Sequence, residues 1–199
     1  MTNELRTEQP SVTLGLLLDA AEELFGTHGY ASTSLDAVVA AAGMTKGAVY
    51  HHFRNKAELF REVFVRQQER VAAELEQAAA RAPDAETALR NGARLFLKHC
   101  MDGRVQRITL LDAGAVLGWE TARKIECEHT LRVFQSSMSA VMGSALDAET
   151  LTVRCHMLFA ALREAGMLLA RSTDPERVLA MVTSESERLF APFGGAEAA

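Results

Sequence analysis

The sequence has few prolines and no long apolar run, and each shortage excludes a class of protein. Only four prolines occur among the 199 residues, and alanine-rich amphipathic stretches without strand-like alternation fill most of the chain, which favours helices over strands. No apolar run approaches the roughly 18 residues that a membrane-spanning helix needs. The first residues, MTNELRTEQP, are polar and acidic and do not resemble a secretory leader, so we expect a cytoplasmic protein.

Cysteines are also scarce, and their placement excludes further classes. Cys100, Cys127 and Cys155 are odd in number and far apart, which argues against a disulfide framework and fits a reducing compartment. Each has a histidine one or two residues away, but such neighbours on a helix point about 100° to 200° apart and cannot chelate one ion together. No catalytic Ser/His/Asp or Cys/His order, carboxylate pair or phosphate-cradling glycine loop stands out either. We therefore predict no enzyme, no metal site and no cofactor.

The formal net charge of −5 speaks at first against a nucleic-acid partner. The charge is unevenly distributed, however. No carboxylate lies between Asp36 and Glu58, whereas Lys46, Arg54 and Lys56 lie there together with two histidines. A local positive strip is what contact with phosphates requires, whatever the sign of the whole chain.

The same stretch, TSLDAVVAAAGMTKGAVYHHFRNK at 33–56, predicts two short helices around a tight turn. Thr33 or Ser34 can cap the first helix. Gly43 tolerates the positive φ that the turn between the helices needs. Two helices around a glycine-containing turn have the geometry that places the second helix in the major groove of DNA.

The second of these helices begins at Thr45 and is too polar and too rich in small residues to serve packing alone. Val49 and Phe53 face inward at i, i+4 spacing, which leaves Gly47 and Ala48 on the outer side. Small residues let a helix backbone approach a surface closely, and hydroxyl, ammonium, phenol and imidazole groups surround them. A solvated helix face is the plainer interpretation of the same residues, so the pattern leaves both alternatives open.

Helical spacing continues on both sides of this stretch, and we predict an all-α fold of about nine helices. Residues 1 to about 11 form a polar tail in this interpretation. A first helix runs from Leu14 until Gly26 and Gly29 end it, and Asn55 with Glu58 opens a long helix to about Ala80. Further helices are predicted at about 85–101, 104–112, 119–143, 148–171 and 175–191. The predicted units are a DNA-binding module at 11–60, a connecting helix at 61–82 and a larger helical module at 83–193.

Across residues 13–64 the sequence resembles the N-terminal domain of the tetracycline-repressor (TetR) family of bacterial transcription regulators. LLLDAAEELFGTHGYASTSLDAVVAAAGMTKGAVYHHFRNKAELF carries the resemblance without a gap. It departs from the family at Gly15, where a basic or polar residue is common. The resemblance implies a homodimeric repressor that binds a palindromic operator in double-stranded DNA. The DNA-contacting residues that it implies are Thr33, Ser34, Thr45, Lys46, Gly47, Ala48, Tyr50, His51, His52 and Lys56.

The resemblance also implies that the larger module dimerises through its last two long helices and binds a small-molecule effector that releases DNA. Candidates for an effector pocket are polar groups embedded in apolar sequence, for which a structural ion pair or an exposed edge is the alternative role. These candidates are Asp112, Trp119, Arg123, His129, His156, Arg163 and Glu164. An alternative function keeps DNA binding but makes this module a protein-interaction platform without an effector. A fully packed interior favours the platform, and a cavity of several hundred Å³ favours a ligand.

Overall fold

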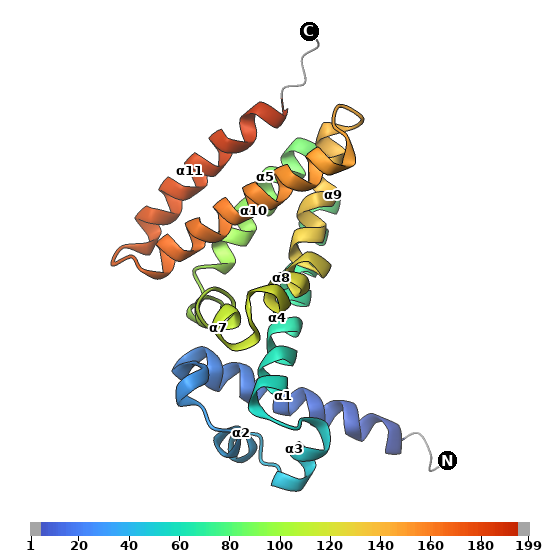
Figure 1. Cartoon of the computed structure of the whole chain (residues 1–199), viewed down its shortest axis with the longest axis vertical. Helices are drawn as coiled ribbons and strands as arrows, with labels where there is room; N and C mark the ends of the chain where they lie inside the picture. Colours follow the sequence, from blue (N-terminus) through green and yellow to red (C-terminus); the bar gives the residue numbers. More distant parts are fainter. Residues whose placement is uncertain (1–4, 195–199) are drawn as a thin grey trace.

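A computed structural model of the chain describes the backbone of residues 5–194 and the side chains of 14–190. Two groups of helices are joined by α4 (Lys56–Ala80), which runs from one group into the other (Figure 1). Every regular element in the described range is helical, which confirms the predicted all-α class. None of these helices combines the length and the apolar character that crossing a membrane requires.

The smaller group consists of α1 (Leu5–Ser32), α2 (Leu35–Ala41) and α3 (Lys46–His52), packed against the first turns of α4. Helix α1 begins earlier than predicted, so the prediction of a polar tail is wrong from residue 5 onward, and residues 1–4 lie outside the described range. Gly29 has a φ of 79° and breaks the helical geometry of α1. The predicted end of the first helix near this glycine is therefore confirmed.

Side-chain caps explain where several helices begin. Ser34, Thr45, Asn55, Asp84 and Asp147 each precede a helix, and the side chain of each accepts a hydrogen bond from the backbone N–H three residues later. Such a cap satisfies one of the free N–H groups of the first helical turn, so these short polar residues set the helix starts locally.

The larger group contains the remaining helices, and two of its predicted helices are subdivided. The predicted helix at 119–143 is broken at His129, whose φ of −123° and ψ of −96° are not helical. The prediction of about nine helices is therefore slightly low. The elements are α5 (Ala85–His99), α6 (Gly103–Val105), the π-helical η1 (Gln106–Asp112), α7 (Ala113–Leu117), α8 (Trp119–Glu128), α9 (Thr130–Met142), α10 (Ala148–Ala170) and α11 (Pro175–Gly194).

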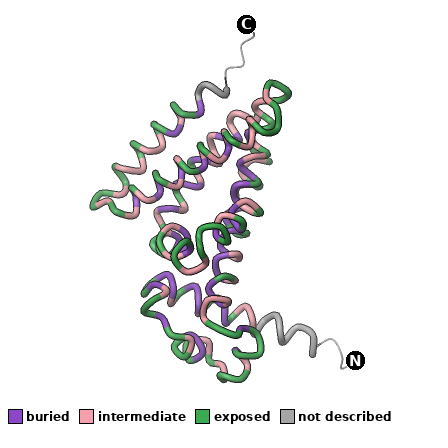
Figure 2. Tube along the Cα trace, in the orientation of Figure 1, coloured by how far each residue is buried: buried purple, intermediate pink, exposed green. Residues whose placement is uncertain are grey.

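One hydrophobic cluster contains residues of both groups. Buried residues follow α4 from the smaller group into the larger one (Figure 2). The Phe60 ring of α4 lies edge-on to Phe25, with ring centres 5.2 Å apart, and to Tyr30 at 5.3 Å. Ile108 and Ile125, which belong to the larger group, are buried in the same cluster. The helices of the smaller group therefore pack directly against the larger one.

Polar contacts also connect α1 to α6 and η1. The backbone N–H of Tyr30 donates to Asp112 Oδ2 at 2.8 Å, and Arg104 Nη1 lies 3.1 Å from Glu23 Oε2. A Cβ at Gly26 would lie 2.5 Å from Cγ of Arg104, so glycine permits this close approach. Asp112, a predicted effector contact, is therefore engaged within the fold and holds the end of α1 next to η1.

Candidate nucleic-acid interface

The α2–α3 pair forms the tight helical hairpin that the sequence predicts. Gly43 lies between the helices with a φ of 67°, a conformation that other residues adopt with strain. Thr45 Oγ1 accepts from the N–H of Ala48 at 3.3 Å and so begins α3. Val49 is fully buried against the core and fixes which side of α3 faces outward.

The outer side of α3 lies at the end of the molecule farthest from α10 and α11 (Figure 1). Lys46, Gly47, His51 and His52 are exposed there, and 52% of Tyr50 is exposed. A Cβ at Gly47 would have no atom within 4 Å, so the backbone of α3 is open to a partner surface on this side. Together with Ser34 and Thr45, which are also exposed, and the half-buried Ala48, these residues form one surface, which we call the α3 face.

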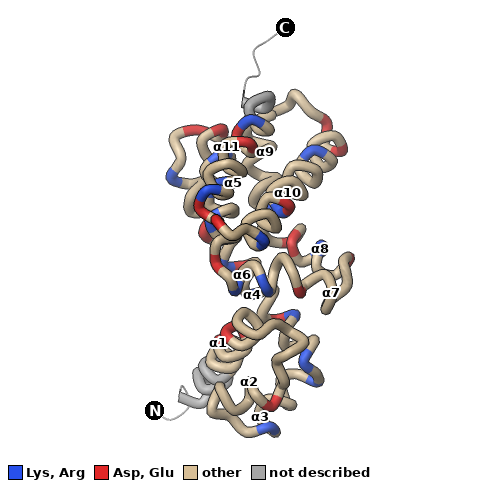
Figure 3. Tube along the Cα trace, turned by 90° about the vertical axis from the view of Figure 1, so that its left-hand side faces the viewer, with Lys and Arg blue, Asp and Glu red and all other residues tan. Residues whose placement is uncertain are grey.

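The positive charge of the α3 face is partly compensated, which the sequence pattern does not predict. Lys46 Nζ lies 2.7 Å from Asp36 Oδ2 on α2, and both side chains are exposed. The hydrogen bond to Asp36 raises the pKa of Lys46. Basic and acidic residues therefore lie side by side at this end of the molecule (Figure 3), and Lys46 must leave Asp36 or share it to contact a phosphate.

Two predicted DNA contacts, Thr33 and Lys56, have hydrogen-bond partners within the fold. Thr33 is only 3% exposed, and its hydroxyl lies 2.9 Å from the carbonyl oxygen of Gly29 and 3.1 Å from that of Leu24. Its backbone N–H donates to the carbonyl of Tyr30, so neither donor is available to DNA. Lys56 Nζ donates to the carbonyls of Tyr30 and Thr33 at 2.7 and 2.8 Å. These contacts fix the end of α1 against the start of α4.

Arg54 is exposed directly after α3 and was not among the predicted contact residues. Its backbone N–H donates to Glu58 Oε2 at 2.9 Å, while the N–H of Glu58 donates to Asn55. This arrangement resembles a capping box and holds the segment between α3 and α4 in place. The only sequence signal for Arg54 is its place in the positive strip.

Five of the seven predicted effector residues come together in the larger group. Trp119, Arg123, His156, Arg163 and Glu164 line an open hollow of about 490 Å³ between α8 and α10, which we call the α8–α10 groove. Asp112 and His129 do not line it. His129 instead lies at the break between α8 and α9.

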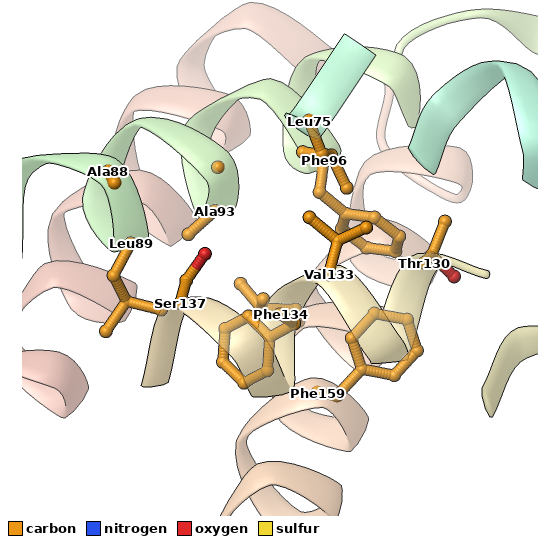
Figure 4. A pocket seen from close by; sticks show the side chains of 12 residues that line it. Leu75, Ala88, Leu89, Ala93, Phe96, Thr130, Val133, Phe134, Ser137 and Phe159 are labelled. Carbon is orange, nitrogen blue, oxygen red and sulfur yellow. The ribbon is translucent and has the colours of Figure 1, made fainter. Parts of the chain in front are cut away.

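The interior of the larger group contains a narrow apolar cleft between α5, α9 and α10. Phe134 and Phe159 form one wall, and the hydroxyls of Thr130 and Ser137 are its polar groups (Figure 4). The cleft has a volume of only about 20 Å³. In this conformation the cleft is much smaller than the several hundred Å³ that a drug-sized ligand occupies.

The cysteines are placed unfavourably for thiol chemistry. Burial raises the pKa of the Cys100 thiol to about 12 and that of Cys155 to about 11, and it also raises the pKa of Cys127. The reactive thiolate form is therefore disfavoured at all three positions. Among the residues that the structure describes, no group of three His, Cys, Asp or Glu side chains is arranged to hold a metal ion.

Comparison with known sequences matches both parts of the chain. The family model for "Bacterial regulatory proteins, tetR family" matches residues 17–63, and that for "Tetracyclin repressor-like, C-terminal domain" matches residues 86–193. The transcriptional regulator AcrR of Shigella flexneri is 48% identical over 48 residues, which is 24% of this chain and 22% of AcrR. The transposon Tn10 TetC protein of Escherichia coli is 28% identical over 113 residues, 57% of each chain. These matches thus span about a fifth to just over half of the relatives' lengths.

Solved structures resemble almost the whole chain. A TetR-family transcriptional regulator from Pectobacterium atrosepticum superposes with a TM-score of 0.76 at 27% identity, covering 94% of this chain and 96% of that one. FadR from Bacillus subtilis, solved in complex with stearoyl-CoA, has a TM-score of 0.75 at 17% identity over 90% of this chain and 98% of its own. The second likeness concerns the fold alone.

Proposed function

The chain belongs to the TetR family of bacterial regulatory proteins, and from this premise we propose that it is a homodimeric repressor released from its operator by a small molecule. The α3 face carries the proposal. Its backbone is open at Gly47, and hydroxyl, ammonium, phenol and imidazole groups surround it. Such a helix can enter a major groove, use its polar side chains on phosphates and read a few base edges.

The direct test is selection of bound sequences from a pool of random DNA duplexes, followed by affinity measurement through fluorescence anisotropy. A dimer with two α3 faces is expected to enrich an inverted repeat, because the symmetry of the DNA site mirrors that of the protein. Enrichment of a single half-site would contradict the dimer, and absence of any sequence preference would contradict the regulator itself.

The expected dimer surface lies on α10 and α11, which run side by side (Figure 1). Large apolar side chains are exposed along one side of α10, at spacings that place them within about 60° of each other, and others are exposed on α11. They are Val153, Leu168, Met181 and Leu189, whereas the exposed Met157 lines the α8–α10 groove. Pairing with a second copy across a two-fold axis would bury them in a four-helix bundle.

Replacing both Leu168 and Met181 with glutamate is expected to convert the dimer to a monomer, because carboxylates would have to enter an apolar interface. Analytical ultracentrifugation measures the change. Leu16→Glu is the matched control, since Leu16 is equally exposed but lies on α1. A double variant that remains dimeric at micromolar concentration would place the interface elsewhere.

Asp36→Asn is expected to strengthen operator binding several-fold, because it frees Lys46 and removes a carboxylate from the α3 face. The slope of log affinity against log salt concentration should steepen by about 2 for the dimer, because each of its two α3 faces gains one phosphate contact. Asp147→Asn is the control, since asparagine also caps a helix and Asp147 starts α10. Unchanged affinity and slope would mean that Lys46 does not contact phosphate.

The narrow interior cleft favours a second candidate function, in which the larger group is a protein-interaction platform without an effector. A packed interior offers no room for a buried ligand in this conformation. The two functions differ in what releases the operator. Screening small molecules for release from DNA, with the same anisotropy assay, separates them.

A further inference from the structure

The α8–α10 groove has a charged floor built on a buried carboxylate. Glu126 of α8 is 1% exposed. Its Oε2 lies 3.1 Å from Nη1 of Arg123 and 3.1 Å from Nη1 of Arg163, so two guanidinium groups share one carboxylate oxygen. Because guanidinium groups stay protonated in proteins, the floor carries more positive than negative charge.

Arg163 has hydrogen-bonding capacity left over. Its Nε is buried and has no hydrogen-bond partner in the described part of the chain. The Arg163 side chain as a whole is 27% exposed and lines the groove, so an anion there can accept charge-assisted hydrogen bonds from its guanidinium group. The guanidinium group of Arg123 has more partners within the fold, since it also lies over the ring of Phe159 at 5.4 Å and next to His156.

His156 supplies a second donor. Its Nδ1 lies 3.0 Å from Nη2 of Arg123, and because arginine only donates, Nδ1 must accept. Burial and the charge of Arg123 lower the pKa of His156, which keeps the ring neutral. The ring proton is then on Nε2, which can donate to a ligand.

The walls of the groove are apolar and partly flat. Trp119 is 71% exposed at one side, and Met157 and Met167 line the other. An indole ring offers a stacking surface for a planar group, and thioether side chains adapt to its shape. Glu164 is the one carboxylate among the residues that line the groove, and it is exposed.

We propose that the α8–α10 groove binds a small aromatic carboxylate, with the carboxylate on Arg163 and His156 and the ring against Trp119. This site rests on the proposed function, because it identifies the chemical class of the effector. It also explains how an effector can act although the interior cleft is narrow.

The groove is connected to the DNA-binding end through α8 itself. Ala122 and Ile125 lie on the same helix as Arg123 and Glu126 but are buried in the cluster that contains Phe60 of α4. A ligand that binds Arg163 and separates it from Glu126 removes an ion pair that joins α10 to α8. A shift of α8 would be transmitted to α4, and thus to the spacing of the two α3 faces, through this shared core.

The test uses benzoate and 1-naphthoate as probes, with benzamide and 1-naphthamide as uncharged matches. Binding is measured by calorimetry, and for benzoate also by the emission of Trp119, the single tryptophan of the sequence. Saturable binding of the carboxylates and not of the amides is expected. Arg163→Gln should weaken binding by about tenfold or more, since it removes a charge-assisted contact, and Arg163→Lys should retain part of it.

Two further variants sharpen the result. Glu164→Gln should tighten carboxylate binding by removing a like charge, and Lys124→Gln should leave it unchanged, because Lys124 is an exposed cation of α8 that does not line the groove. Binding of neither probe, equal binding of the amides, or unaltered binding by Arg163→Gln would overturn the proposed site. If the protein prefers an operator but binds neither probe, the site alone is wrong. If it shows no DNA sequence preference, the proposed function fails independently of the probes.

Discussion

Gly47→Glu is expected to reduce operator affinity by about 100-fold or more, equivalent to about 2.7 kcal/mol. The substitution places a carboxylate on the side of α3 that would face phosphates, and its side chain keeps the helix backbone away from the groove. The variant should fold as stably as the original protein, because a Cβ at Gly47 meets no atom within 4 Å and glycine is a poor helix former. Fluorescence anisotropy with the selected operator measures the loss.

Gly114→Glu is the matched control for this experiment. Gly114 is also an exposed glycine in the first turn of a short helix, with no atom within 4 Å of its Cβ position, but it lies on α7. The same charge change there should leave operator affinity within about twofold, since it is remote from the expected phosphates. Equal losses in both variants would point to overall charge rather than to the α3 face as the cause.

Phe60→Ala is expected to lower the free energy of unfolding by about 3–5 kcal/mol, the range for truncating a buried phenylalanine. The Phe60 ring is fully buried, contacts Phe25 and Tyr30, and belongs to the cluster that joins both groups of helices. The cavity left behind would therefore loosen the DNA-binding end and its attachment to the larger group together. Urea denaturation followed by circular dichroism measures the change.

Tyr50→Ala provides the comparison, because it truncates an exposed aromatic side chain of the same group of helices. Its free energy of unfolding should change by about 0.5 kcal/mol or less, while operator binding weakens. Phe60→Leu should lie between the two, because leucine fills part of the cavity. A loss of about 1 kcal/mol or less in Phe60→Ala would mean that the shared core does not hold the two groups together.

Local chemistry explains why much of the fold is predictable from the sequence. The helix starts at Ser34, Thr45 and Asn55 depend on a side chain and a backbone N–H three residues away, so a short window of sequence contains all the information. The break at His129 is different. No glycine or proline marks it, and Thr130 just after it is buried with its hydroxyl bonded to Gln68 of α4, a contact between distant parts of the chain.

The candidate sites likewise have features that the local sequence predicts and features that depend on distant parts of the chain. The outward side of α3 follows from the spacing of Val49 and Phe53, and both of these side chains are buried as predicted. The burial of Thr33 depends on carbonyl groups at the end of α1, which the local pattern of a capping residue does not reveal. The five predicted residues that line the α8–α10 groove come from two helices, and Arg123 of α8 contacts His156 of α10, 33 positions later in the chain.

The sequence by itself therefore determined most of the helices, the hairpin of α2 and α3 and the family resemblance, because these depend on side-chain spacing and capping over a few residues. Only the tertiary structure decided that Lys46 is paired with Asp36, that Lys56 holds the end of α1, and that Arg123 and Arg163 share Glu126. The contacts of Lys46, Lys56 and Arg163 each join different helices, whereas Arg123 and Glu126 are three positions apart on α8. Their partners depend on how the helices pack, and a pattern read along one helix contains no information about that packing.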